Sequence, residues 1–373
     1  MGAIGFRLLS AVLAFFANLA FPLDQPEPFT MWGRTSPFWD TFTRYDSGYY
    51  WGIARYGYSP LAGGRSNIAY FPVYPYLMRY VGRLFGRTPG DLYLGGIVVA
   101  WTCYVLAMVA LYHLARLDLP RRQAERAVLL ATIFPFAFFF GVAYSESTFL
   151  LFTILAFYAF RTRRWLLGGV GGAMAIATRT PALVMLPGLA WVAWRSAEVT
   201  TKDRVRAALA LALTTMGFAA YCWYIYRLTG NPLEWAATLE RWGTGYRPGG
   251  AFWTAPLSLI GHLVTHPYAY LAGDPVALYD TLYGVTAIAF LVAVPFVWMR
   301  LNGGYAMYML LNLLLPLSTG AFEGLGRYCS ILFPCFIWLA SIRSRPVGTA
   351  LVVLFALFYT LGIALFTTIH PLF

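Results

Sequence analysis

VGTALVVLFALFYTLGIALFTT, residues 347–368, is a long apolar run that contains no charged side chain. A helix of about 20 apolar residues crosses the roughly 30 Å hydrocarbon core of a bilayer. Inside that core every backbone polar group needs a partner within the protein, so a spanning segment is either a helix or a strand of a closed barrel. Barrel strands alternate apolar and polar residues, and this run does not. It therefore predicts a transmembrane helix.

The composition of the whole chain agrees with this interpretation. Of 373 residues, 60% are hydrophobic and 11% are charged, and the mean hydropathy is +0.62. Soluble chains are about half apolar and about a quarter charged, so a soluble domain is excluded and an all-α, polytopic membrane protein is predicted. The net charge is +12, and the basic residues, all arginine except Lys202, stand mostly between apolar segments. Orientation signals have this position, so we expect membrane lipids as partners and no nucleic acid.

Ten further apolar segments precede this one. We expect about eleven transmembrane helices that form a single membrane-embedded domain, residues 1–373, without a soluble domain or an internal repeat. The eleven segments are residues 3–23, 93–115, 127–144, 148–160, 165–178, 181–194, 207–227, 276–299, 304–319, 328–342 and 347–368.

The short loops predict the orientation of the chain. Loops 145–147 and 320–326 contain no Lys or Arg. The basic clusters all fall on the opposite, cytoplasmic side if the N-terminus with Arg7 is cytoplasmic. Two long loops, residues 24–92 and 228–275, then lie outside. The basic clusters are at residues 116–126, 161–164, 195–206, 300 and 343–345.

The first long loop, residues 24–92, contains an amphipathic stretch. Residues 70–85 interleave aromatic and aliphatic side chains with Arg79 and Arg83. Such a pattern is typical of a helix that lies in the membrane interface. We therefore predict an interfacial helix within this loop.

Two pairs of apolar segments are too short to cross the membrane completely. A helix of about 13–14 residues spans only about 20 Å at about 1.5 Å per residue, which is less than the hydrocarbon thickness. We expect their turning points, at residues 145–147 and 179–181, to lie below the outer membrane surface. Charge at that depth is tolerated where it lines a water-filled cavity. Glu146 and Arg179 would then share an outward-facing pocket; the alternative is that both occupy ordinary surface loops.

The stretch FTRYDSGYYWGIARYGY, residues 42–58, combines an acid, arginines and many aromatic rings. Aromatic faces stack on sugar rings and prenyl chains. Arg44 can pair with a phosphate, and Asp46 can take a proton from an acceptor hydroxyl. A solvated turn residue is the alternative for this acid.

Five blocks, in this order along the chain, resemble the GPI mannosyltransferase (PIG-V) family of the GT-C superfamily of lipid-phosphate-sugar-dependent membrane glycosyltransferases. One departure is Tyr45, where the family usually has Trp, and residues 196–325 show no match. The blocks are TRYDSGYYWGIARYGY (43–58), NIAYFPVYPYLMR (67–79), FPFAFFFGVAYSESTFLLF (134–152), ATRTPALVMLPGL (177–189) and GRYCSILFPCFIWLA (326–340).

The resemblance implies roles for individual residues. It implies that Asp46 is the essential acid, that Glu146 is a second functional acid, and that Arg179 and Arg327 face the phosphate. The implied fold is GT-C-like, the implied donor is polyprenyl-phosphate mannose, and the implied product is an α-mannoside formed with inversion. The predicted catalytic residues are Asp46 and Glu146, and the predicted substrate-binding residues are Arg44, Tyr45, Tyr49, Tyr50, Tyr74, Arg179, Arg327 and Tyr328.

Sugar transfer from a polyprenyl phosphate requires few groups besides these residues. A polyprenyl phosphate is a good leaving group, so the site needs a base for the acceptor hydroxyl and positive charge for the phosphate. The sequence contains no Gly-rich phosphate loop and no Asp-x-Asp pair. We therefore expect neither a nucleotide-sugar donor nor a cofactor, and we expect a metal-independent reaction with the lipid-linked sugar as substrate.

The alternative function is a transporter or lipid flippase, which would also carry polar residues within the membrane. Transporters often show paired halves, and no such repeat is seen here. The acceptor is expected to be a glycolipid, a glycan or another extracytoplasmic molecule. The single lysine favours a bacterial plasma membrane with an outward-facing site; the alternative is the endoplasmic reticulum membrane with a lumenal site. The sequence does not indicate an oligomeric state.

Overall fold

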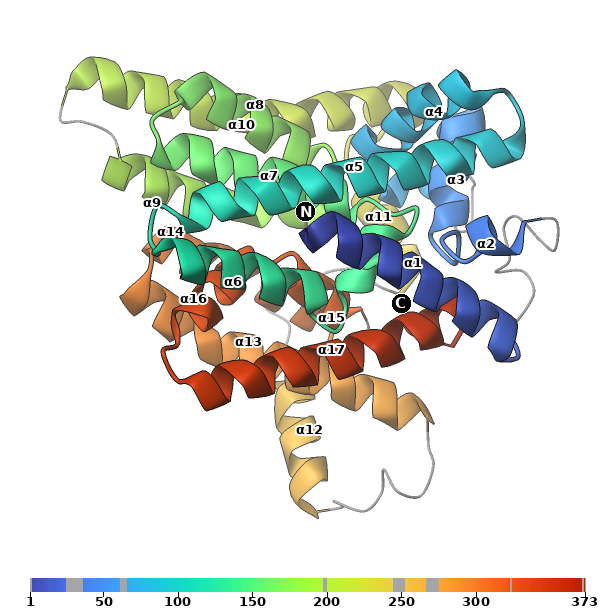
Figure 1. Ribbon diagram of the computed structural model, residues 1–373. Coiled ribbons are helices and arrows are strands. Elements are labelled where there is room, and N and C mark those ends of the chain that lie inside the picture. Colours follow the sequence, from blue (N-terminus) through green and yellow to red (C-terminus); the bar gives the residue numbers. More distant parts are fainter. Residues whose placement is uncertain are drawn as a thin grey trace.

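The computed structural model describes residues 2–24, 36–60, 66–196, 200–243, 252–265, 275–322, 324–370 and 372. Within these ranges the chain forms α-helices and short 3-10 helices, and no strand occurs. The long helices run roughly side by side, and the elements of the first long loop gather at one end of the bundle (Figure 1). The predicted all-α class is therefore confirmed for the described residues.

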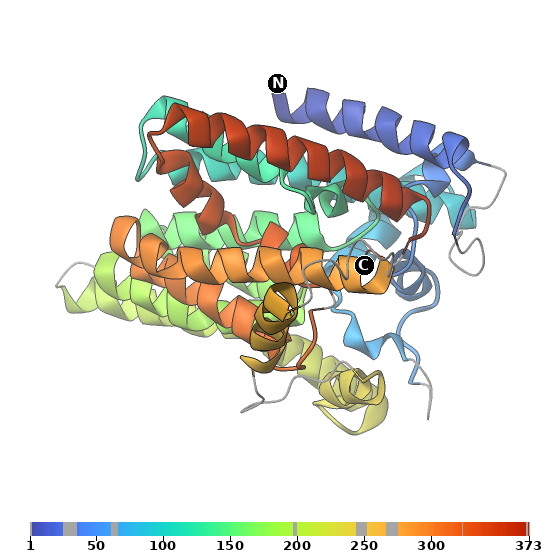
Figure 2. The ribbon, with the colours of Figure 1, turned by 90° about the horizontal axis from the view of Figure 1, so that it is seen from below.

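Among the described residues, five helices are long and apolar enough to cross a membrane. Their long apolar runs are the reason that the sequence predicts them as membrane spans, because apolar side chains are stable in contact with lipid. In both views α1 lies beside α17 at an angle to it, and the two helices are in contact (Figures 1 and 2). The five are α1 (Gly2–Ala20), α5 (Pro89–Ala115), α10 (Thr201–Thr229), α13 (Pro275–Arg300, with Leu278–Arg300 as the candidate span) and α17 (Arg345–Thr367).

The other six predicted segments form shorter helices. Three of these segments are split into two pieces, and each contains a proline at or near the break: Pro135, Pro187 and Pro334. Proline lacks the amide hydrogen that a continuous helix requires. The pieces are α6 (Arg121–Ile133), η3 (Ala137–Gly141), α7 (Glu146–Arg161), α8 (Trp165–Ile176), η4 (Thr180–Met185), α9 (Leu186–Ser196), α14 (Gly303–Leu317), α15 (Leu325–Ser330) and α16 (Phe333–Ser341).

The first long loop contains α2 (Pro37–Asp40), α3 (Ser47–Tyr56), η2 (Asn67–Ala69) and α4 (Val73–Phe85). Helix α4 corresponds to the predicted interfacial helix, and it packs against α5. The contact is between backbones: a Cβ added to Gly95 would lie 2.3 Å from the Gly82 nitrogen. Small residues permit such close approach between helices. The glycines therefore fix α4 onto the bundle.

The second long loop contributes α11 (Glu234–Arg241) and α12 (Thr254–Thr265). Helix α11 contacts η2, so the two long loops meet. Helix α12 projects from the bundle beside α13 (Figure 1).

Arg7, which the sequence places among the charges of the cytoplasmic side, is buried between helices. This residue is 3% exposed. Its guanidinium donates to Tyr359 Oη (3.4 Å) and to the Ala137 carbonyl (3.3 Å), and lies 4.5 Å from the centre of the Tyr104 ring. Because neighbouring helices supply these partners, the arginine can be buried where a count of loop charges would place it at the surface.

Candidate active site

Asp46 lies at the start of α3, immediately after an unusual backbone turn. Tyr45 has a φ of +46°, a left-handed conformation that is uncommon for residues other than glycine. The Tyr45 hydroxyl donates to the His370 carbonyl (2.7 Å), which ties this turn to the C-terminal end of the chain. Conformations of this kind persist where the surroundings hold them, and they cluster at functional sites. Tyr45 therefore shapes the turn that presents Asp46.

Glu146 joins two arginines that are distant in sequence. It begins α7, Arg179 precedes η4, and Arg327 lies in α15. The Glu146 Oε1 atom accepts hydrogen bonds from both guanidiniums, and the Glu146 side chain is fully buried. The structure thus brings together the turning points of the short segments and the C-terminal Arg-Tyr block.

Asp46 is attached to this group through Arg327. The Arg327 Nη1 atom lies 2.6 Å from Asp46 Oδ2. On its other side, the Tyr70 hydroxyl donates to Asp46 Oδ1 (2.8 Å), and the Asp46 amide donates to Tyr144 Oη (3.2 Å). The Asp46 side chain is 25% exposed, whereas that of Glu146 is 0% exposed. Asp46 is therefore the acid that a ligand can reach.

The four charged residues, Asp46, Glu146, Arg179 and Arg327, form what we call the charge cluster. Two carboxylates balance two guanidiniums, so the cluster has no formal net charge. Glu146 Oε2 and Arg179 Nε are buried and have no hydrogen-bond partner among the described residues. Such atoms are rare in folded proteins, so the cluster retains bonding capacity. Within the same ranges, no three His, Cys, Asp or Glu residues gather as a metal-binding group.

Aromatic rings surround the charge cluster. The Arg327 guanidinium lies 4.5 Å from the Tyr144 ring centre and 5.4 Å from that of Phe139. Arg179 lies 5.8 Å from the ring centre of Tyr328, a predicted binding residue that is half-buried. Cation–π contacts of this kind favour charged guanidinium groups. They keep both arginines cationic in surroundings from which most water is excluded.

Two tyrosines of the first loop act as neutral hydrogen-bonding groups. Tyr50 Oη lies 2.7 Å from Ser145 Oγ, which in turn accepts from Arg179 Nη1 (3.3 Å). Burial, and then the charge of Glu146, raises the pKa of Tyr50 above its ordinary value. Burial, and then the charge of Asp46, raises the pKa of Tyr70 above its ordinary value as well. Both hydroxyls therefore keep their protons at neutral pH.

The sequence prediction did not single out Tyr70, Tyr144 or Ser145 as site residues. All three lie inside the blocks on which the family resemblance rests, NIAYFPVYPYLMR and FPFAFFFGVAYSESTFLLF. Their positions in the sequence could have indicated them, because Tyr144 and Ser145 directly precede Glu146 and Tyr70 directly precedes the Phe-Pro element.

Two predicted binding residues, Arg44 and Tyr74, bond to groups of the fold other than the charge cluster. Arg44 is fully buried; its guanidinium bonds to Asp40, to Asn18 Oδ1 (3.1 Å) and to the Thr367 carbonyl (3.2 Å). Tyr74 is also fully buried, and its hydroxyl donates to the Gly96 carbonyl (3.0 Å). Because the polar atoms of both side chains bond to other parts of the fold, Arg44 and Tyr74 stabilise the first long loop. The phosphate role expected of Arg44 stays a prediction.

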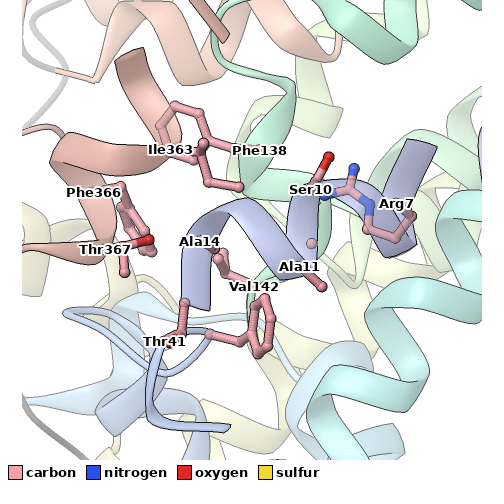
Figure 3. Close-up of a pocket in the computed structure, with 12 residues that line it drawn as sticks. Arg7, Ser10, Ala11, Ala14, Thr41, Phe138, Val142, Ile363, Phe366 and Thr367 are labelled. Atoms are coloured by element: carbon pink, nitrogen blue, oxygen red, sulfur yellow. The ribbon is translucent and has the colours of Figure 1, made fainter. Parts of the chain in front are cut away.

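Figure 3 shows a small, mainly apolar cavity between α1, α17 and η3. Arg7 and Ser10 lie at one end, and Phe366 and Thr367 at the other. Among the described residues, none of the charge cluster lines this cavity, and Arg7 is the one charged residue that does. The candidate reactive groups therefore lie at the charge cluster, where acids and cations meet and one acid is partly exposed.

Residues 70–224 match the model of a family described as dolichyl-phosphate-mannose-protein mannosyltransferase. The match covers less than half of the chain. It includes Glu146 and Arg179, whereas Asp46 and Arg327 lie outside it. No curated protein matches the chain significantly.

Several solved structures are similar to the whole chain. An Archaeoglobus fulgidus oligosaccharyltransferase in complex with Zn and sulfate is 14% identical, with a TM-score of 0.50, over 99% of this chain and 53% of that chain. ArnT from Cupriavidus metallidurans, bound to undecaprenyl phosphate, is 13% identical, with a TM-score of 0.49, over 100% and 77% of the two chains. The archaeal oligosaccharyltransferase AglB from Archaeoglobus fulgidus, with an inhibitory peptide and a dolichol-phosphate, is 12% identical, with a TM-score of 0.48, over 100% and 56%.

The chain thus spans little more than half the length of the archaeal enzymes. At such low identity the oligosaccharyltransferase likeness shows the fold alone. The comparisons do not single out the PIG-V family suggested by the sequence blocks. In fold, and over residues 70–224 in sequence, this integral membrane protein is similar to membrane glycosyltransferases of the GT-C kind.

Proposed function

We propose that this protein is an inverting mannosyltransferase. It moves a mannosyl residue from polyprenyl-phosphate mannose to a lipid-linked or other extracytoplasmic acceptor and forms an α-mannoside. The observation that carries the proposal is the partly exposed acid Asp46 bound to Arg327, which shares Glu146 with Arg179. The description of the matching family supports a lipid-phosphate mannose donor.

Asp46 is the base in this mechanism. Its carboxylate takes the proton of the acceptor hydroxyl while the acceptor oxygen bonds to the anomeric carbon of the donor. The bond from that carbon to the phosphate oxygen breaks, and its electron pair leaves with the polyprenyl phosphate. Each carboxylate oxygen can accept about two hydrogen bonds, so Asp46 can receive the hydroxyl beside Arg327 and Tyr70. A single displacement inverts the anomeric centre.

Arg179 and Arg327 stabilise the departing phosphate. A guanidinium has five N–H donors, and only some of them are used in the charge cluster. The remaining donors match the geometry of phosphate oxygens. The cluster is mostly buried, so this pairing is stronger than in water. Because two cations supply the charge, the proposed reaction needs no metal.

Glu146 acts by positioning the arginines. Its side chain is fully buried, so an acceptor cannot reach it, and it contacts both guanidiniums. We therefore assign it to holding Arg179 and Arg327 in place, rather than to proton transfer.

The placement of the reaction forms part of the same proposal. The charge cluster faces outward if the eleven apolar segments all cross the membrane with the basic loops inside. A bacterial plasma membrane then presents the site to external acceptors, and in an endoplasmic reticulum membrane the site would face the lumen.

The test compares the purified protein with Asp46→Asn in detergent. Radiolabelled polyprenyl-phosphate mannose is the donor, and alkyl glycosides and Ser/Thr peptides are offered as acceptors. We expect label transfer by the wild type and a rate about 10² to 10⁴ lower for Asp46→Asn. Asp24→Asn, the same change of charge at another outer-loop acid, serves as the control.

A folded Asp46→Asn variant that transfers sugar at the wild-type rate would rule out Asp46 as the base. A second measurement addresses the transporter alternative. If reconstituted wild type leaves the donor intact but moves labelled lipid or solute across vesicles, the protein is a transporter and the proposed function is wrong.

A further inference from the structure

Three aromatic side chains from the two long loops meet beside Asp46, and we call them the aromatic cluster: Tyr49, Tyr70 and Trp242. Tyr49 and Tyr70 are stacked, with ring centres 5.0 Å apart and an angle of 18° between planes. The Trp242 ring lies 5.4 Å from Tyr49 and 5.8 Å from Tyr70. All three side chains are half-buried, so each still presents surface to a ligand.

The carboxylate of Asp46 separates the aromatic cluster from the arginines. Its Oδ2 atom accepts from Arg327, whereas its Oδ1 atom accepts from Tyr70. In an inverting displacement the acceptor oxygen attacks the face of the sugar opposite the leaving phosphate. If the phosphate lies with the arginines, the acceptor reaches the base from the Tyr70 side. The aromatic cluster is therefore on the side from which the acceptor must approach.

Trp242 also offers a free hydrogen-bond donor. Its Nε1 atom is buried and has no acceptor within the described residues. A buried indole N–H normally finds a partner, and a ligand hydroxyl would supply one. The Tyr70 hydroxyl adds a second polar atom at the edge of the cluster.

We propose that the aromatic cluster is the acceptor subsite and that it binds a neutral pyranose ring, the end sugar of a glycan or glycolipid. This inference rests on the proposed function. Flat aromatic walls fit the C–H faces of a sugar ring, and the N–H and O–H groups at their edges fit its hydroxyls. The subsite lies largely outside the family match, since Tyr49 and Trp242 are not within residues 70–224. The second long loop thus determines which acceptor is used.

The first experiment measures sugar binding without catalysis. Methyl α-mannopyranoside and methyl β-glucopyranoside are titrated against the purified protein by saturation-transfer NMR. We expect at least one glycoside to bind the wild type, and Trp242→Ala to weaken that binding about tenfold. Trp242→Phe should lose less, because it keeps an aromatic face. Trp253→Ala is the matched control, since Trp253 lies in the same loop and is 59% exposed.

The second experiment measures transfer from radiolabelled polyprenyl-phosphate mannose. We expect Trp242→Ala to raise the KM for an octyl glycoside about tenfold and to leave the KM for the donor unchanged. The proposal is overturned if Trp242→Ala binds the glycosides as the wild type does, if no glycoside binds the wild type, or if the wild type uses a Ser/Thr peptide and no glycoside.

The two proposals can fail separately. Sugar binding that depends on Trp242, in a protein that releases no mannose from the donor, would overturn the proposed function and leave the aromatic subsite standing. Donor turnover that depends on Asp46, together with sugar binding that is unchanged in Trp242→Ala, would overturn the aromatic subsite and leave the proposed function standing.

Discussion

Arg327 joins the two acids of the charge cluster: its Nη1 atom lies 2.6 Å from Asp46 Oδ2, and its Nε atom donates to Glu146. In the proposed reaction, the cation that binds the leaving phosphate therefore also holds the base. Without donor, both negative charges are compensated by arginine. A phosphate that entered the cluster would compete with Asp46 for Arg327, and that competition would free the carboxylate to accept the proton of the acceptor.

Asp46→Asn should therefore separate donor binding from turnover. The change removes one negative charge next to Arg327 and leaves the amide unable to act as a base. We expect donor affinity equal to or higher than that of the wild type, although transfer is nearly abolished. Equilibrium binding of labelled polyprenyl-phosphate mannose measures this. Donor affinity that falls together with the rate would show that Asp46 helps to hold the donor and is not only a base.

Glu146→Gln should damage both stability and the phosphate site. It leaves two buried guanidiniums without their shared carboxylate, and removal of one partner from a buried ion pair costs about 3–5 kcal/mol. We expect a lower Tm in detergent and a higher KM for the donor. Glu125→Gln is the matched control, because the Glu125 side chain is 51% exposed in its pair with Arg121.

A double variant tests whether Glu146 acts through the arginines. Glu146→Gln combined with Arg179→Gln removes one charge of each sign, so its Tm should lie above that of Glu146→Gln alone. Its KM for the donor should remain high, because one phosphate ligand is missing. A purely structural role for Glu146 would predict that Tm and KM recover together.

Variants of Arg44 test whether this residue stabilises the fold or binds the substrate. Arg44→Met leaves Asp40 buried without its guanidinium and removes the bonds to Asn18 and Thr367. We expect a clear loss of Tm, with donor KM unchanged in the fraction that folds. The double variant with Asp40→Asn should be less harmful than Arg44→Met alone. A raised donor KM at an unchanged Tm would instead return Arg44 to the phosphate.

Much of the fold could be predicted because lipid imposes a simple rule on sequence. Every apolar segment inferred from the sequence is helical, at least in part, and prolines at positions 135, 187 and 334 accompany the breaks. The same rule predicted that Glu146 lies near Arg179. Helices that are too short to cross the membrane must turn within it, and each of these residues is at such a turn. The structure brings these two residues into contact.

Contacts between distant segments could not be predicted in this way. Arg44 binds Asn18 and Thr367, which belong to opposite ends of the chain, and nothing local indicates that pairing. Arg7 looks like an orientation signal by its position, yet Tyr359 and other neighbours bury it. Trp242 lies in a region without family resemblance, so only the fold shows that it reaches the rings beside Asp46.

Three tyrosines of the first loop predict how the protein responds to alkali: Tyr50 and Tyr58 are buried, and Tyr70 is half-buried. Burial is the main cause that raises the pKa of Tyr50, Tyr58 and Tyr70 above the ordinary value of about 10. Unfolding exposes them, so above about pH 10 the unfolded chain loses protons that the folded protein retains. The stability that the neutral tyrosines contribute is fully present below that pH and is lost as the pH rises. The slope is about 1.4 kcal/mol per pH unit for each tyrosine.

We therefore expect a nearly constant Tm between about pH 7 and 9 and a steep fall above about pH 10. Tyr58→Phe removes one of these groups together with its hydrogen bond to the Tyr70 carbonyl (2.7 Å). It should lower the Tm at neutral pH but make the alkaline fall less steep. Tyr56→Phe, at a side chain that is 76% exposed, should change neither. Equal alkaline slopes for wild type and Tyr58→Phe would mean that burial of this hydroxyl does not control the response, and that other groups unfold the protein at high pH.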